Sequence, residues 1–131
     1  MDRNYTNIEQ SKELLKLGLN PDTADMYYTN KDEKPTLGYN ATTAEIHKKH
    51  NFLYVPCWST GALKALMPDS VNIVWFNGYE KGFCGYIMKL PNQSEPNLFD
   101  NEYELIVWLL ENDYKLDKHI TIDMSEIPTN Q

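Results

Sequence analysis

The residue types in this sequence that could do chemistry are a cysteine and a pair of histidines. Cys57 stands in the stretch VPCWSTGALKALMP, just ahead of a segment with the pattern of a helix start. A thiol at such a place feels the positive end of the helix dipole, which lowers its pKa and prepares it as a nucleophile. A nucleophilic thiol also needs a base, and His47, His50 and the more distant His119 are the candidates. The sequence alone places none of them beside Cys57.

The same stretch also has a structural interpretation. Ser59 is a good N-cap for the segment TGALKALM, and Pro68 enforces an end to the helix. Trp58 fits a core anchor, and Cys57 stands where a small apolar side chain would also fit. We therefore interpret the stretch as a structural element and predict that Cys57→Ala leaves the fold and reactivity largely unchanged. An enzyme of unknown class, with a Cys57/His thiol site or with carboxylates in a cleft, is the alternative.

No metal site is expected at the two neighbouring histidines. His47 and His50 have the i, i+3 spacing that can bring two imidazoles to one ion. Lys48 and Lys49 lie between them, however, and Glu45 is the one carboxylate close by. We interpret this segment as a solvated basic helix face.

No cofactor is expected either. Gly78, Gly82 and Gly85 are not followed by the Lys-Ser/Thr pair of a phosphate loop, so we interpret them as turn and bulge glycines. Cys57 and Cys84 lack a second close pair of ligands, so no structural zinc is indicated. In a reducing cytosol we expect both to stay thiols.

The net charge of −7 is concentrated in the last third of the chain. Residues 1–90 carry ten acidic and ten basic side chains, whereas residues 91–131 carry nine acidic ones and only Lys115 and Lys118 as basic ones. Such a surface repels phosphate backbones and attracts basic partners. We therefore expect a basic protein partner and no nucleic acid.

Asp100, Glu104, Trp108 and Glu111 fall on one face of a predicted helix, and we call them the acidic stripe. Carboxylates around an aromatic anchor suit a protein-binding surface, because aromatic side chains dominate interface energies. The alternative is a solvated acidic helix face that keeps the protein soluble.

The elements that must position these residues begin with a helix in TNIEQSKELLKLGLN. Thr6 is its predicted cap, Glu9 completes a capping box and Gly18 ends it. A short turn at Asn20–Pro21 and a strand at MYYT follow, and residues 30–40 are interpreted as a surface loop.

Further along, TTAEIHKKHN predicts a helix capped by Thr42 or Thr43, and FLYVP predicts a strand. VNIVWFN and FCGYIMKL predict a β-hairpin, PNQSEPN a loop and LFDNEYELIVWLLENDY a core helix. HITIDM, residues 119–124, is a candidate edge strand.

These elements predict an α+β fold: a single small domain spanning residues 1–131, with a mostly antiparallel sheet and helices packed on one face. Residues 125–131 are expected to fray. The longest apolar run is far shorter than the roughly 20 residues of a membrane span, and no secretory signal is recognisable at the N-terminus. We therefore expect a cytoplasmic protein with no membrane partner.

Two segments, IEQSKELLKLGLNPDTADMYY and PCWSTGALKALMP, resemble small uncharacterised proteins of gut Bacteroides-type bacteria and their prophages and mobile elements. That family has no assigned activity, so the resemblance implies a bacterial or phage setting and no catalytic residue. The first hypothesis is a non-enzymatic protein-binding or regulatory protein that uses the acidic C-terminal third. Besides the enzyme, a structural oligomerising protein with a contact at residues 119–124 is an alternative, and the sequence leaves the oligomeric state open.

Overall fold

The computed structural model describes residues 4–68, 71–78, 80, 82–91 and 93–116. Its helices are α1 (Ile8–Lys16), α2 (Ala41–Lys49), α3 (Thr60–Ala65) and α4 (Glu102–Glu111), with a short 3₁₀ helix η1 (Pro21–Thr23). Its strands are β1 (Met26–Thr29), β2 (Asp32–Leu37), β3 (Tyr54–Cys57), β4 (Asn72–Gly78), β5 (Phe83–Lys89) and β6 (Asn97–Phe99).

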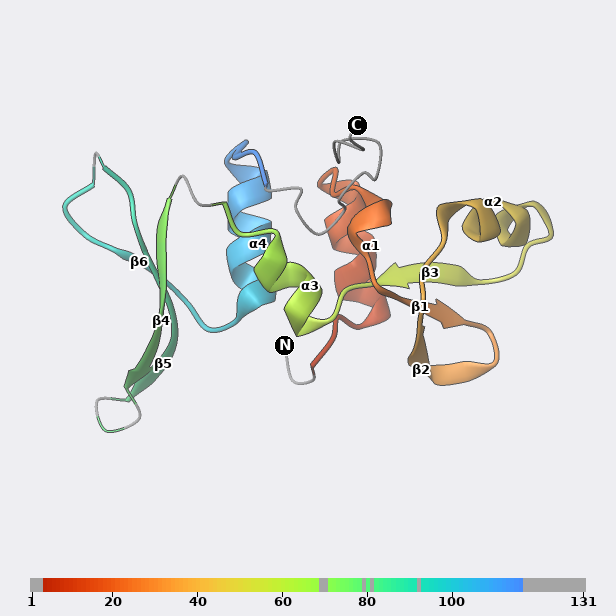
Figure 1. Ribbon diagram of the computed structural model, residues 1–131, viewed down its shortest axis with the longest axis horizontal. Coiled ribbons are helices and arrows are strands. Elements are labelled where there is room, and N and C mark those ends of the chain that lie inside the picture. The colour runs from red at the N-terminus through yellow and green to blue at the C-terminus, as the bar shows by residue number, and fades with distance from the viewer. Residues whose placement is uncertain (1–3, 69–70, 79, 81, 92, 117–131) are drawn as a thin grey trace, which may run out of the picture.

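The strands form two separate three-stranded sheets, in the orders β2-β1-β3 and β4-β5-β6, and every pairing is antiparallel. Figure 1 shows the sheets at opposite ends of an elongated molecule, with α1, α3 and α4 between them. The α+β prediction is confirmed. The strands are divided between two small sheets, whereas the sequence suggested one sheet built around the hairpin.

The first helix is capped one residue later than predicted. Asn7, and not Thr6, is the N-cap of α1, and Gln10 completes the capping box in place of Glu9. Asn7 and Gln10 have the spacing of the predicted pair, so the capping box is present one residue further along the chain. The helix ends as predicted, with Gly18 at a φ of +97° that favours glycine.

The interpretation of residues 30–40 as a loop is wrong. β2 lies within this segment and pairs with β1, with Met26 opposite Leu37 and Tyr27 opposite Thr36. Its sequence DEKPTL has almost no strand propensity. It is extended because it pairs with β1 as an exposed edge strand. The α2 helix that follows is capped by Asn40, whose side chain accepts from the amides of Thr42 and Thr43, the two predicted caps.

The main core lies between the two sheets. Its buried members are contributed by α1, α3, α4, β5 and the chain around them: Leu14, Leu19, Ala24, Trp58, Ala62, Leu63, Leu66, Tyr86, Met88, Leu90, Phe99, Leu105, Ile106 and Leu109. Trp58 has no exposed surface, and its indole N–H donates to the hydroxyl of Thr23 over 2.8 Å. Ser59 caps α3 as predicted, and Asp25 accepts from both its amide and its hydroxyl.

The hairpin of β4 and β5 is confirmed, with Asn72 opposite Lys89 and Gly78 opposite Phe83. The helix predicted after it starts later than expected, because residues 97–99 form β6 beside β5 before α4 begins. At the start of α4 the buried carboxylate of Glu102 accepts from the hydroxyl of Tyr86 over 2.5 Å, which ties the helix to the sheet. Residues 119–124 lie outside the described residues.

Candidate functional site: the outer face of the second sheet

Cys57 is completely buried at the end of β3. Its thiol donates to the carbonyl oxygen of Thr6 over 3.2 Å, and the same oxygen accepts from the hydroxyl of Tyr28 over 2.7 Å. Burial raises the pKa of the Cys57 thiol, although the hydrogen bonds from Thr6 and Tyr28 act in the opposite direction. A buried thiol with a raised pKa is poorly prepared as a nucleophile.

The histidines are occupied elsewhere. Nδ1 of His47 lies 2.8 Å from the carbonyl oxygen of Thr43 in its own helix, and the imidazole packs on the ring of Tyr54, with the centroids 4.7 Å apart. His50 is exposed and lies near the ring of Phe52. The structure therefore does not bring His47 or His50 together with Cys57, whose thiol is held by Thr6.

Thr6 is a central residue that the sequence pattern misassigned as a helix cap. Its hydroxyl accepts from the amide of Trp58 and lies 2.8 Å from the hydroxyl of Ser11, while its amide donates to the carbonyl oxygen of Trp58. Through these contacts the N-terminal segment is fixed to the end of β3. The role is structural, and only the pairing of distant segments could have shown it.

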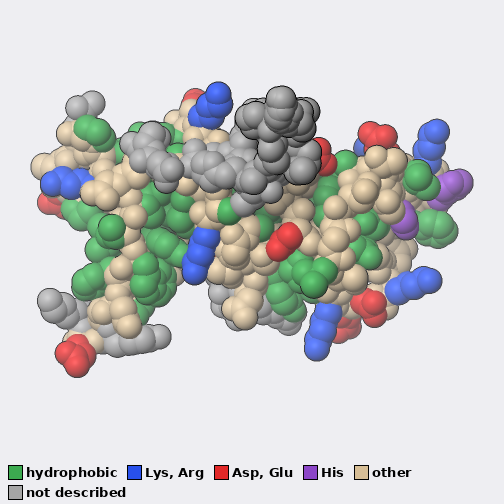
Figure 2. Space-filling view, viewed as in Figure 1, with side chains coloured by type: hydrophobic (Ala, Val, Ile, Leu, Met, Phe, Trp, Pro, Cys, Tyr) green, Lys and Arg blue, Asp and Glu red, His purple; other side chains and the backbone are tan. Residues whose placement is uncertain are grey.

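The members of the acidic stripe differ in exposure. Asp100, Glu104 and Glu111 are exposed on or beside α4. Trp108 is half-buried, with its ring packed between those of Phe99 and Tyr114 at centroid distances of 6.1 and 5.7 Å. Trp108 is therefore a packing residue more than a free anchor. On the face drawn in Figure 2 the acidic side chains are scattered and do not form one patch.

The largest feature that the sequence reasoning missed is one face of the sheet β4-β5-β6. All helices lie on the other side of this sheet in Figure 1. We call the uncovered side the outer face. From the strand register, its residues are Asn72, Val74, Phe76, Gly78, Phe83, Gly85, Ile87, Lys89 and Leu98.

A row of three aliphatic side chains crosses the outer face. Val74 of β4 pairs with Ile87 of β5, and Ile87 pairs with Leu98 of β6. Val74 is 51% exposed and Leu98 is 56% exposed. Figure 2 shows hydrophobic side chains over this end of the molecule. Lys89, at one end of β5, is the single charged residue of the outer face.

Two aromatic rings extend the aliphatic row. Phe76 and Phe83 are stacked with their centroids 6.2 Å apart, and each ring lies close to a glycine. A Cβ atom added at Gly78 would collide with the ring of Phe76, and one added at Gly85 would meet the ring of Phe83 and the carbonyl oxygen of Phe99. Gly78 and Gly85 thus have packing roles within the continuous pairing of β4 and β5, which the interpretation as turn and bulge glycines did not include.

A signal for this surface is present in the sequence. IVWFN is apolar at nearly every position, so it can expose one apolar face whichever side packs on the core. Which side chains lie outside depends on the register with β5 and on the position of the helices. Neither can be read from the hairpin pattern alone.

A hollow lies at the other end of the molecule, beside the first sheet. It has a volume of about 660 Å³ between α2 and β3, and its lining includes Tyr39, Phe52, Tyr54 and Lys48. Tyr54 is stacked on Tyr27 with the centroids 4.4 Å apart, and burial raises the pKa of both Tyr39 and Tyr54. The hollow is wide and open, and its aromatic rings pack mainly on one another.

Within the described part of the chain no three or more His, Cys, Asp or Glu side chains gather as metal ligands would. None of its helices is both long and apolar enough to cross a membrane. Comparisons with protein-family models, curated proteins and solved structures found no match to this chain. The resemblance to Bacteroides-type and prophage proteins thus stays a prediction based on its two sequence segments.

Proposed function

We propose that this chain is a non-enzymatic protein-binding or regulatory protein of the bacterial cytoplasm, as expected for a mobile element or prophage. Its contact surface is the outer face of the sheet β4-β5-β6. The observation that carries the proposal is the exposed aliphatic row of Val74, Ile87 and Leu98, which no described helix covers. Exposed contiguous apolar surface of this kind marks interaction sites in soluble proteins.

Two members of the acidic stripe, Asp100 and Glu104, supply the polar rim of this surface beside the end of β6. Asp100 follows Leu98 by two residues, and Glu104 is linked to the amide of Asp100 over 3.4 Å. Interfaces commonly combine an apolar centre with a charged rim that sets the encounter rate. The partner we propose is therefore a protein with an apolar patch bordered by basic side chains.

An enzymatic role of the Cys57 type has less support. Cys57 is buried and bonded to Thr6, while His47 is bonded within α2. A thiol enzyme needs its nucleophile and base within hydrogen-bonding reach of each other. The binding proposal uses side chains that are already exposed.

The test compares two substitutions at equally exposed aliphatic residues. Leu98 on the outer face is 56% exposed, and Ile46 on α2 is 54% exposed. Tagged wild-type protein, Leu98→Gln and Ile46→Gln are incubated with lysate of the source cells, and the retained proteins are quantified by mass spectrometry. We expect a protein retained by the wild type and by Ile46→Gln to be depleted at least about tenfold with Leu98→Gln.

Salt separates the contributions of the apolar centre and the acidic rim. An Asp100→Asn/Glu104→Gln variant should lose retention at low salt, while at high salt it should match the wild type, because screening already removes the rim attraction. Equal retention by wild type, Leu98→Gln and Ile46→Gln would contradict the proposal.

A further inference from the structure

The edge strand β4 of the second sheet has an unusual composition. β4 is an edge strand in the described sheet order, and its seven residues NIVWFNG contain no charge and no proline. An edge strand presents unpaired backbone N–H and C=O groups, and soluble proteins normally protect such edges with charges, proline or a cover. β4 carries neither of the first two protections, and no described element covers it.

The same molecule contains a protected edge for comparison. β2 is the edge of the first sheet and contains Asp32, Glu33, Lys34 and Pro35 within six residues. The free edge at the far side of the second sheet, β6, is only three residues long. β3, the other edge of the first sheet, has four residues and contains Pro56, so β4 is the long unprotected edge of the described chain.

Trp75 marks the middle of β4. It is 55% exposed, although part of its ring packs edge-on against its cross-strand partner Tyr86, with the centroids 4.9 Å apart. A half-exposed tryptophan beside an unpaired strand edge is the kind of side chain that dominates interface energies. It projects on the helix side of the sheet, away from the outer face.

We propose that β4 pairs antiparallel with β4 of a second copy of this chain, so that two three-stranded sheets join into one of six strands around a two-fold axis. With the axis at Trp75, Trp75 meets its own copy, and Val74 lies opposite Phe76 of the other copy. Both pairs are apolar or aromatic, so the strand is complementary to itself.

Charge favours a second copy over a basic protein at this edge. β4 has no charged side chain, so self-pairing places no like charges opposite each other. A basic partner would find no carboxylate in the strand. Because each copy carries a net charge of −7, the two copies repel at long range, and added salt should strengthen the dimer. Partner capture at the acidic rim has the opposite salt dependence, so the two contacts can be told apart.

The first measurement is sedimentation equilibrium of the full chain over a wide concentration range at low and high salt. We expect a monomer–dimer equilibrium that shifts toward the dimer as salt is added. Trp75→Lys and Val74→Lys should each weaken the dimer by about 100-fold, because the two-fold symmetry counts each lost contact twice. Far-UV circular dichroism establishes whether each variant is folded. If Trp75→Lys does not fold, the result with Val74→Lys tests the proposal.

Leu98→Gln is the matched control, because Leu98 lies on the same sheet but at the opposite edge. It should leave the dimer intact while it lowers partner capture. Failure of the dimer and failure of the proposed function are thereby distinguishable.

Amide hydrogen exchange locates the contact without any substitution. Peptides that cover β4 should become better protected as the concentration rises, whereas those that cover β2 should not change. A chain that stays monomeric at all concentrations and salt levels, with β4 exchange independent of concentration, would overturn the proposal. Dimerisation that survives Val74→Lys in a folded variant would also overturn it.

Discussion

The two sheets of this protein have the same number of strands and the same antiparallel pairing, but they differ in how much of each face is exposed to solvent. In β2-β1-β3 the face of Tyr27 and Tyr54 is covered by His47 from α2, and the opposite face, with Tyr28 and Cys57, packs on the N-terminal segment. In β4-β5-β6 the helices cover one face only.

The difference extends to the edges. The exposed edge of the first sheet is charged and contains Pro35, whereas the exposed edge of the second is neutral and contains Trp75. In the first sheet, β1 and β3 pack on both faces, and the exposed strand β2 is protected by its charges and Pro35. A sheet with an apolar open face and a neutral edge has surface that stays unsatisfied until another chain covers it. This contrast is why our proposal places the binding surface on the second sheet and not on the first.

The largest effect should come from Trp58 in the core, and it is best measured against Trp75 on the exposed edge of the second sheet. Trp58→Ala should lower the free energy of unfolding by about 3–5 kcal/mol, because it empties the centre of the core and leaves the hydroxyl of Thr23 without its donor. Trp75→Ala should cost only about 1 kcal/mol in dilute monomer, through its contact with Tyr86. Urea denaturation of both variants measures the difference, and equal losses would remove the distinction between core and surface.

Within the second sheet, Gly85→Ala should cost about 1–3 kcal/mol. The added methyl group would collide with the carbonyl oxygen of Phe99 and force β5 and β6 apart. Gly61→Ala in α3 is the control, since its nearest neighbour is the Ser59 hydroxyl at 3.7 Å and alanine favours the helix by up to about 1 kcal/mol. The melting temperature should fall for Gly85→Ala and rise for Gly61→Ala. A rise for both variants would mean that β5 and β6 can adjust their spacing to the added methyl group.

The link between the second sheet and α4 depends on one polar pair. Tyr86→Phe removes the hydroxyl that donates to the buried carboxylate of Glu102 and should cost about 1–3 kcal/mol at neutral pH. Chemical denaturation measures this loss. The substitution keeps the aromatic ring, so a loss of stability reports on the hydroxyl alone. An unchanged stability in Tyr86→Phe would mean that Glu102 finds another donor.

The same tyrosine gives a pH dependence with a definite sign. Burial, followed by the hydrogen bond to Glu102 and its charge, raises the pKa of Tyr86 far above the usual value for tyrosine, which is about 10. Between these two pKa values the unfolded chain loses the proton while the folded chain keeps it. The stability due to Tyr86 is thus complete below about pH 10 and is lost as the pH rises further. Unfolding measured above pH 10 should show a shallower decline for Tyr86→Phe than for the wild type.

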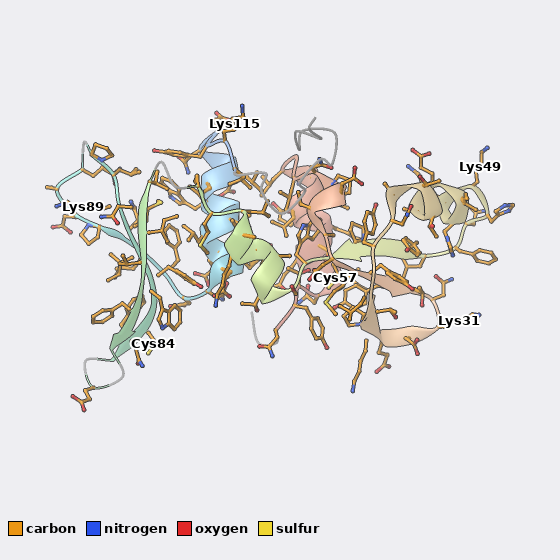
Figure 3. The ribbon with its side chains drawn as sticks, in the orientation of Figure 1. Lys31, Lys49, Cys57, Cys84, Lys89 and Lys115 are labelled. Atoms are coloured by element: carbon orange, nitrogen blue, oxygen red, sulfur yellow. The ribbon has the colours of Figure 1, made fainter. Side chains whose placement is uncertain are left out.

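The smallest effect concerns the two cysteines, which lie in different sheets, as Figure 3 shows. Cys57→Ala should keep the fold at a cost of about 1 kcal/mol, since it removes one small buried group and its hydrogen bond to Thr6. Iodoacetamide should label the half-exposed Cys84 and leave Cys57 unmodified in the folded protein, as read by mass spectrometry. Cys84→Ser should then show no label. Fast labelling of Cys57 at pH 6 would revive the thiol-site alternative.

Local motifs made much of this fold predictable. The glycine stop at Gly18, the cap at Ser59 and the hairpin of β4 and β5 are each specified by residues close together in the sequence. The errors occurred where a distant segment decides the outcome. β2 is a strand because β1 lies beside it, and Thr6 serves the end of β3 instead of the helix that follows it.

The candidate site divides in the same way. The exposure of Glu104 and Glu111 follows from helical periodicity in the sequence, whereas Asp100 precedes the N-cap Asn101 and lies outside the helix. The position of Trp108 between Phe99 and Tyr114 does not follow from the sequence, because residues 97–99 have the pattern of a loop and a helix start and not that of a strand.

The sequence by itself determined the α+β class, the glycine stop at Gly18, the cap at Ser59 and the apolar character of IVWFN, because caps, turns and side-chain periodicity act over a few residues. Only the tertiary structure decided that the strands form two sheets, that Cys57 is buried against Thr6, and that Val74, Ile87 and Leu98 share an open face. Those outcomes depend on which face each strand turns to the helices, and that choice is made by packing between segments far apart in the chain.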